Sequence, residues 1–184
     1  MIRIMLLGYM GSGKSTLGKP LARELGVQFF DLDRYLEDRF HTTVPKLFAE
    51  KGEEGFRDVE RRMLHEVAEF EDVVIACGGG TPCFFDNMDY MNQQGETVFL
   101  KAETHVLQAH LMMGKTQRPL IQGKTAEELT NYINESLEQR VPFYSKAKHT
   151  VSIDLIERND QIMDYVKKII EMCGVTPKSS ESNI

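Results

Sequence analysis

The stretch GYMGSGKS, residues 8–15, gives the strongest indication of the fold. It fits the pattern GxxxxGK[ST], and it lies between an apolar, β-rich run at 2–7 and a segment of helical character at 14–25. The glycines are needed because such a loop wraps backbone N–H groups around phosphates, in a shape that side chains would obstruct. The position of the match between strand and helix disfavours the alternative, a glycine-rich turn that binds nothing.

The polar residues of this loop have separate expected roles in binding ATP. Lys14 is expected to reach the β- and γ-phosphates, and Ser15 to place its hydroxyl on Mg²⁺. The helix that begins there directs the positive end of its dipole at the anion. The loop residues expected to bind the nucleotide are Gly11, Ser12, Gly13, Lys14, Ser15 and Thr16.

Strands and helices are predicted to alternate along the rest of the chain. Further β-rich runs lie at 27–32, 73–77, 97–100 and 150–153. Helical patterns lie at 52–71, 87–94, 104–112, 126–139 and 159–172. This alternation is typical of a parallel sheet with helices on both faces. We predict an α/β, three-layer P-loop NTPase fold, in which helices flank a five-stranded parallel sheet.

Composition narrows the class of protein. The 184 residues have room for one domain, 1–176, followed by a polar tail at 177–184 that we expect to be disordered. The 22 basic and 28 acidic side chains give a net charge of −6, which argues against nucleic acid or a membrane surface as a partner. The three scattered cysteines and the lack of a signal-like start indicate a cytoplasmic protein, which we expect to be a monomer.

Two carboxylates follow the second predicted strand, in FFDLD at 29–33. In a parallel sheet, this strand end lies at the same edge as the phosphate loop. Asp31 is placed to hold Mg²⁺, and Asp33 lies one step farther out, where it could orient or deprotonate an acceptor hydroxyl. The alternative for Asp33 is an aspartate that only caps a helix or a turn.

Two segments fit the alternation poorly. The segment 33–55 is charged and irregular, and 114–124 is rich in Gly, Lys and Gln. Insertions beside the carboxyl ends of a sheet are usually substrate clamps or lids. Arg118 lies in the second segment, where it could swing over ATP and stabilise charge on the transferring phosphoryl group.

Three further features are ambiguous when each is taken alone. The run CGGGTP at 77–82 could let a small ligand touch the main chain, or could be a plain flexible turn. Arg57 opens a predicted helix, where a lone arginine is more often a solvated charge. Arg140 ends a predicted helix, where its charge could simply complement the carboxyl end of the helix.

The ordered set of motifs resembles that of the shikimate kinase family, over essentially the whole chain to about residue 173. The motifs are GYMGSGKSTLG, FFDLD, EEGFRDVE, CGGG, RPL and RVPFY. The resemblance implies transfer of the γ-phosphoryl group of ATP to the 3-hydroxyl of shikimate, within the pathway to chorismate and aromatic amino acids. It also implies Mg²⁺ as the cofactor, with ATP and shikimate as the two substrates.

The resemblance also assigns roles to the residues that bind the second substrate. Asp33 would hold the ring hydroxyls of shikimate and is a candidate base. Arg57 and Arg140 would clamp the carboxylate, because a planar guanidinium matches it bidentately. Gly79 would offer a backbone contact.

The metal, the lid and the subdomains follow from the same resemblance. Ser15 and Asp31 would serve Mg²⁺. Arg118 would act from a lid at 112–124 that closes over the phosphates and excludes water, so the catalytic set would be Asp33, Lys14 and Arg118. The segment 33–61 would form the substrate-binding subdomain.

Other functions stay open at this point. The loop 154–158 is not clearly matched, which leaves Arg158 as a candidate for adenine or ribose contact only. A kinase for gluconate or a nucleoside monophosphate would share the fold and the phosphate chemistry. The glycine turn and the two arginines favour a carboxylated polyol instead. A nucleotide-dependent switch is disfavoured, since the sequence has no N-K-x-D motif and no clear D-x-x-G motif.

Overall fold

The computed structural model describes residues 1–113 and 122–178 of the chain. Within them, one sheet contains the strands β1 (Arg3–Leu7), β2 (Gln28–Asp31), β3 (Val73–Ala76), β4 (Glu96–Ala102) and β5 (His149–Ile153). All paired strands are parallel, and their order across the sheet is β2-β3-β1-β4-β5. The predicted five-stranded parallel sheet is confirmed.

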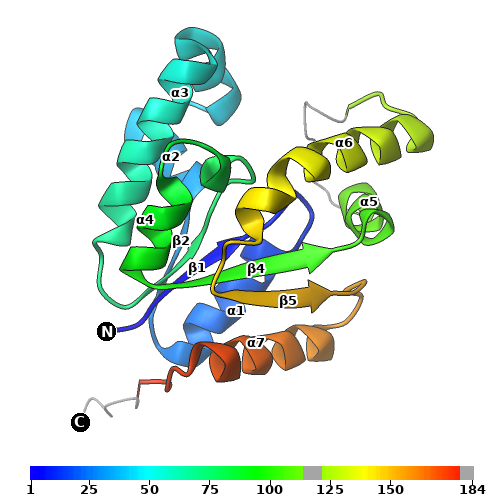
Figure 1. Cartoon of the computed structure of the whole chain (residues 1–184). Coiled ribbons are helices and arrows are strands. Elements are labelled where there is room, and N and C mark those ends of the chain that lie inside the picture. The colour runs from blue at the N-terminus through cyan, green and yellow to red at the C-terminus, as the bar shows by residue number, and fades with distance from the viewer. Residues whose placement is uncertain (114–121, 179–184) are drawn as a thin grey trace.

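Helices cover both faces of this sheet (Figure 1). They are α1 (Lys14–Leu25), α2 (Leu32–Phe40), α3 (Val44–Ala68), α4 (Asn87–Gln94), α5 (Thr104–Met113), α6 (Ala126–Tyr144) and α7 (Asn159–Cys173), with a short 3₁₀ turn η1 (Thr81–Cys83). In Figure 1, α1 and α7 lie below the sheet, and α3, α4 and α6 lie above it. This arrangement has the three predicted layers.

The central strand β1 explains why two helical layers are needed. Its last four residues are fully buried: Ile4, Met5, Leu6 and Leu7. Successive side chains of a strand point to opposite faces of the sheet. Met5 and Leu7 accordingly pack with side chains from α3 and α4, whereas Ile4 and Leu6 pack with side chains from α1 and α7. Because both faces of the strand are apolar, both must be covered.

The segment 33–55 was expected to be irregular, and this prediction is wrong. The segment contains most of α2 and the first half of α3. Both helices begin with a side-chain cap, since Asp31 accepts from the backbone N–H of Arg34 and Thr43 accepts from that of Lys46. A break at Gly52, with φ 68° and ψ 178°, separates α3 into two parts, which is why its sequence pattern begins at 52.

One predicted helix start agrees with the structure, and one predicted helix end does not. Arg57 lies near the start of the second part of α3, five residues after the break at Gly52. Arg140 lies four residues before the end of α6, because this helix continues through Pro142 to Tyr144 rather than ending at 139. The alternative in which Arg140 only complements a helix end therefore loses its basis.

The C-terminal end of the described chain is held against the end of α1 and the residue before β3. The backbone N–H of Lys178 donates to the carbonyl of Leu25 (3.1 Å), and its ammonium lies 2.5 Å from Asp72. Lys178 belongs to the predicted tail, of which 179–184 lie outside the described residues. Among the helices of 1–113 and 122–178, none is both long and apolar enough to span a membrane.

Candidate active site

The carboxyl ends of the five strands bring the candidate residues to one edge of the sheet. The loop at 8–13 follows β1, α2 follows β2, and a turn of three glycines at 78–80 follows β3. These three strands are neighbours in the sheet. Residues that are far apart in the sequence therefore meet there, as expected for a parallel sheet with its ligand at the strand ends.

The glycine-rich loop between β1 and α1 has a backbone shape that other residues would disturb. Gly8 and Gly11 have φ values of 147° and 83°, a region that side chains disfavour. A Cβ atom on Gly8 would lie 2.8 Å from the carbonyl oxygen of Leu100 and 2.6 Å from Oγ of Ser12. Ser12 is itself buried inside the loop, and its backbone N–H donates to the carbonyl oxygen of Tyr9 at 3.1 Å.

The side chain of Lys14 is hydrogen-bonded to the backbone of this loop. Its ammonium donates to the carbonyl oxygens of Gly8 (2.8 Å) and Tyr9 (2.9 Å). Gly13 stands directly before α1 in a left-handed conformation, so the first N–H groups of the helix open onto the same space. A lysine ammonium beside a helix N-terminus forms an anion site, and phosphate is the anion it suits.

Ser15 and Asp31 meet on the other side of the loop. The hydroxyl of Ser15 donates to Oδ2 of Asp31 at 2.6 Å. Both are hard oxygen donors, the kind that Mg²⁺ prefers, and Mg²⁺ usually keeps several waters and phosphate oxygens besides one or two protein ligands. Within the described part of the chain, no three His, Cys, Asp or Glu side chains gather into a metal site. Because nucleotide phosphates and water can supply the remaining ligands, the Ser15 and Asp31 oxygens would fit Mg²⁺ held jointly with a nucleotide.

Asp33 lies in the first turn of α2, two residues after Asp31. The helix cap is provided by Asp31, so Asp33 is not the capping residue. The side chain of Asp33 is exposed, but many protein atoms surround it. They partly desolvate the carboxylate, and together with the negative charges of Asp31 and Glu60 this raises its pKa from 3.8 to about 6. Lys14 acts in the opposite direction. A carboxylate with this pKa is suited to accept a proton near neutral pH.

The three glycines after β3 are each approached by a side chain from another helix. A Cβ atom on Gly78 would lie 3.1 Å from Oδ1 of Asp33. A Cβ atom on Gly79 would lie 3.2 Å from Nη1 of Arg140, and one on Gly80 would lie 2.6 Å from Nη2 of Arg57. Asp33, Arg57 and Arg140 therefore converge on a single turn, and a side chain on any of its glycines would crowd one of them.

Arg57 is held in place by a buried carboxylate. Its Nη1 donates to Oε1 of Glu60 at 2.8 Å, and Glu60 is only 1% exposed. The other carboxylate oxygen of Glu60 accepts from the hydroxyl of Thr81 at 2.8 Å. The guanidinium of Arg57 also lies over the ring of Phe84, 4.1 Å from its centre. These contacts fix the orientation of the guanidinium plane beside the glycine turn.

A cavity of about 400 Å³ lies between the phosphate loop and the glycine turn, and neither Arg57 nor Arg140 belongs to its lining. Asp31, Asp33 and the glycine turn border one side of it, and the phosphate loop borders another. Its remaining wall includes His110, Met113 and Ile156. A nucleotide phosphate on the loop and a small acid on the glycine turn would thus share one space, as direct phosphoryl transfer requires.

Comparison with known proteins identifies the family. The family model described as shikimate kinase matches residues 10–171. A shikimate kinase of Phocaeicola vulgatus is 58% identical over 169 residues, covering 92% of this chain and 97% of that protein. The chain belongs to the shikimate kinase family. Membership of this family makes it an ATP-dependent kinase, which confirms the predicted enzyme class.

Solved structures of shikimate kinases have the same fold. The crystal structure of the enzyme from Bacteroides thetaiotaomicron gives a TM-score of 0.93 at 53% identity, covering 95% of this chain and 99% of that one. The enzyme from Acinetobacter baumannii in complex with shikimate gives 0.81 at 30% identity, covering 93% and 94%. The three-layer α/β architecture of this shikimate kinase family member is therefore that of its solved relatives.

Most of the residues that the family resemblance selected lie around this one cavity. Gly11, Gly13, Lys14, Ser15 and Thr16 line its phosphate end. The prediction for Arg118 falls outside the described residues, as does most of the predicted lid at 112–124. The roles of the individual residues stay predictions.

Two residues at the site of this family member were missed in the sequence. Glu60 follows Arg57 by three positions, and this helical spacing was the available signal for a pair. His110 had no such signal. Its Nδ1 lies 2.8 Å from the carbonyl oxygen of Gly11, and its Nε2 accepts from the backbone N–H of Ile156 at 3.0 Å. One ring thus links the phosphate loop to the loop after β5.

Proposed function

We propose that this protein transfers the γ-phosphoryl group of ATP to the 3-hydroxyl of shikimate, giving shikimate 3-phosphate and ADP. The observation that carries the proposal is the convergence of Asp33, Arg57 and Arg140 on the glycine turn. Residues of this turn and of the phosphate loop line the same cavity. Two guanidinium groups and one carboxylate suit a small molecule that has one carboxylate and neighbouring hydroxyls. Membership of the shikimate kinase family supports the same substrate.

The acceptor is positioned by groups on three helices. Arg57 and Arg140 bind the carboxylate of shikimate, and Gly79 presents its backbone to the ring. Asp33 accepts a hydrogen bond from the reacting hydroxyl and can take its proton as the bond to phosphorus forms. Because the transition state of phosphoryl transfer is loose, orientation of the hydroxyl by Asp33 matters at least as much as removal of the proton.

The donor is bound by the residues at 11–16. Backbone N–H groups of the loop and the ammonium of Lys14 bind the phosphates and stabilise the charge that moves onto ADP. Ser15 and Asp31 would hold Mg²⁺, which when bound supplies charge neutralisation at the β- and γ-phosphates. Arg118, from the proposed lid at 112–124, adds positive charge at the transferring group and helps to exclude water.

Further proposals concern the setting in which the protein works. We propose a cytoplasmic monomer whose partners are ATP and shikimate, with 1–176 as a single domain that includes an acid-binding subdomain at 33–61. The net charge of −6 supports the proposal that nucleic acid and anionic membranes are not partners.

The test is an ADP-release assay with Mg-ATP and a panel of acceptors. The panel contains shikimate, quinate, gluconate and nucleoside monophosphates, with a control that lacks an acceptor. We expect strong stimulation by shikimate and little by the others. Stimulation by another acceptor would overturn the acid-site proposal and leave the kinase class intact. ADP release that needs no acceptor would favour a nucleotide hydrolase.

A further inference from the structure

The glycine turn at 78–80 is tied to α6 by a tyrosine that the proposed mechanism does not use. The hydroxyl of Tyr144 donates to the carbonyl oxygen of Gly79 at 2.5 Å. Tyr144 is fully buried, and a buried phenol usually finds a partner for its hydroxyl. Arg140 lies four positions earlier on the same helix, so that both side chains leave α6 on the same face.

The other carbonyls of the turn have local partners. That of Gly78 accepts from the backbone N–H of Thr81 (3.1 Å), and that of Gly80 accepts from the backbone N–H of Cys83 (2.9 Å). The carbonyl of Gly79 is instead bound by a side chain from α6, about 65 residues away along the chain. Three consecutive glycines have unusual backbone freedom, so this single bond restrains the middle of the turn against the helix.

The bond also sets the distance between two groups proposed to bind the acid. Nη1 of Arg140 lies 3.2 Å from the position that a Cβ atom on Gly79 would take, and the hydroxyl of Tyr144 lies 3.7 Å from it. The guanidinium of Arg140 stands over the ring of Tyr9, 5.4 Å from its centre. A shift of Gly79 would therefore change the space in which a carboxylate meets Arg140.

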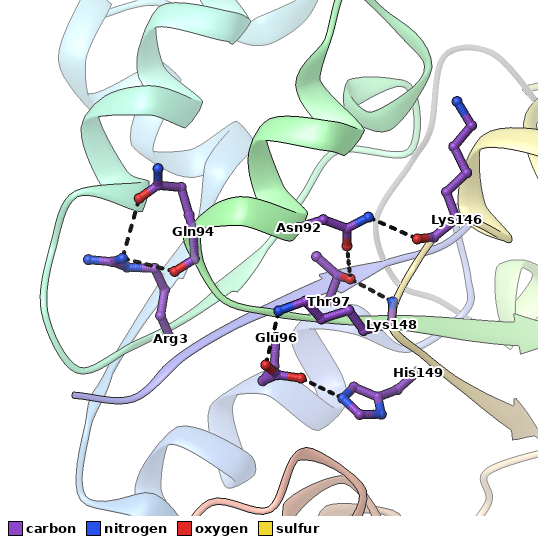
Figure 2. Close-up of polar contacts among 8 residues, drawn as sticks. All are labelled: Arg3, Asn92, Gln94, Glu96, Thr97, Lys146, Lys148 and His149. Carbon is purple, nitrogen blue, oxygen red and sulfur yellow. Dashed lines mark hydrogen bonds and ion pairs between the residues drawn. The ribbon is translucent and has the colours of Figure 1, made fainter.

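The chain just after Tyr144 is anchored by a hydrogen-bonded cluster, which Figure 2 shows. The side-chain amide of Asn92 donates to the carbonyl of Lys146 (2.9 Å), and the hydroxyl of Thr97 donates to Oδ1 of Asn92 (2.5 Å). The backbone N–H of Lys148 donates to the same hydroxyl of Thr97 (2.9 Å). The end of α6 is thereby fastened to α4 and β4, which gives the hydroxyl of Tyr144 a fixed position.

We propose that Tyr144 is a positioning residue for the acceptor acid, acting through Gly79 and the spacing between Gly79 and Arg140. The inference rests on the proposed function, because it assigns the acid to this end of the cavity. A purely structural tyrosine would stabilise the fold without preference for either substrate. A positioning tyrosine acts on the acid and leaves the nucleotide end of the cavity unchanged.

Tyr144→Phe removes the hydroxyl and keeps the ring, which packs against Phe99 with ring centres 5.1 Å apart. We expect the KM for shikimate to rise about tenfold, as for the loss of one hydrogen bond to a buried carbonyl. We expect kcat and the KM for ATP to stay within about twofold. The matched control is Tyr165→Phe, which removes a hydroxyl that accepts from the backbone N–H of Asp154 at 2.9 Å. It should leave the KM for shikimate unchanged.

A double-mutant cycle with Arg140→Lys tests the route of the effect. If Tyr144 acts through the spacing to Arg140, its effect on the KM for shikimate shrinks at least threefold in the Arg140→Lys background. Thermal unfolding of each variant, measured alongside, shows that the fold is retained. Equal rises in the KM for shikimate and for ATP, or an unchanged KM for shikimate, would overturn the inference.

Calorimetric titration of the wild-type protein with shikimate separates this inference from the proposed function. If the wild-type protein neither binds nor phosphorylates shikimate, the proposed function fails, and the inference fails with it. If the wild-type protein binds shikimate and Tyr144→Phe binds it equally well, the inference alone is overturned. Weaker binding by Tyr144→Phe, with nucleotide binding unchanged, supports it.

Discussion

Replacement of Asp33 by Asn is expected to make the protein more stable at pH 8 while it loses activity. The pKa of Asp33 is raised from 3.8 to about 6 by its surroundings and by the neighbouring acids. A carboxyl whose pKa is raised on folding favours the folded state below the unfolded pKa, and this contribution is lost as the pH rises through the folded pKa. Above about pH 6, the ionised Asp33 therefore opposes folding.

The size of the effect follows from the same values. A rise from 3.8 to about 6 corresponds to an upper limit of about 3 kcal/mol in the free energy of unfolding. Solvent reaches Asp33 through the cavity, and screening reduces this limit, so we expect about 1 kcal/mol. Near pH 4, where Asp33 is protonated in the folded protein, most of the advantage of Asn should disappear.

Urea unfolding of the wild type and of Asp33→Asn, followed by circular dichroism, measures the difference in their free energies of unfolding at pH 8 and at pH 4. The expected result is a gain of about 1 kcal/mol for Asp33→Asn at pH 8, and a much smaller gain at pH 4. Shikimate-dependent turnover should fall together with affinity for shikimate, because Asn can neither accept the proton nor hold the hydroxyls in the same way. If the variant is less stable than the wild type at pH 8, the charge of Asp33 does not oppose folding. If it turns over normally, Asp33 does not act on the acceptor hydroxyl.

Three further predictions concern neighbouring groups. The ratio kcat/KM for shikimate should fall below about pH 6, because Asp33 becomes protonated there. Glu60→Gln should shift this fall to lower pH, because the charge of Glu60 raises the pKa of Asp33. If the pH-rate profiles of the wild type and of Glu60→Gln fall at the same pH, Glu60 does not act on Asp33 in this way. Arg118→Ala should lower kcat more than it raises the KM for shikimate, and steady-state kinetics with an unchanged kcat would contradict the lid role. Gly80→Ala should raise the KM for shikimate by about tenfold or more, because its Cβ would lie 2.6 Å from Nη2 of Arg57; unchanged shikimate kinetics would show that Arg57 is not positioned by this turn.

The parts of the site that were predictable from the sequence are those whose chemistry is local. The phosphate loop has its own spacing of glycine, lysine and serine, and the apolar runs of the buried strands mark the edge where it lies. The expectation that Asp31 and Asp33 meet this loop followed from the parallel topology alone. In the structure, Ser15 and Asp31 are 2.6 Å apart, as that topology requires.

The parts that were not predictable depend on tertiary contacts. The start of α3 was missed because Gly52 divides one helix into two short patterns, and because its first half is too charged to give a clear apolar stripe. The end of α6 was missed because proline usually ends a helix, whereas Pro142 falls in the last turn of α6, which reaches Tyr144. The hydrogen bonds made by Glu60, His110 and Tyr144 depend on partners that only the folded chain brings together.

Identification of the product shows whether the 3-hydroxyl of shikimate receives the phosphoryl group. Protein, Mg-ATP and shikimate are incubated, and phosphorus and proton NMR establish which oxygen bears the new phosphate. We predict one new phosphate monoester, on the 3-oxygen, in amounts equal to the ADP formed. A phosphate on another hydroxyl, or ADP without any phosphorylated acid, would show that the 3-hydroxyl of shikimate is not the acceptor.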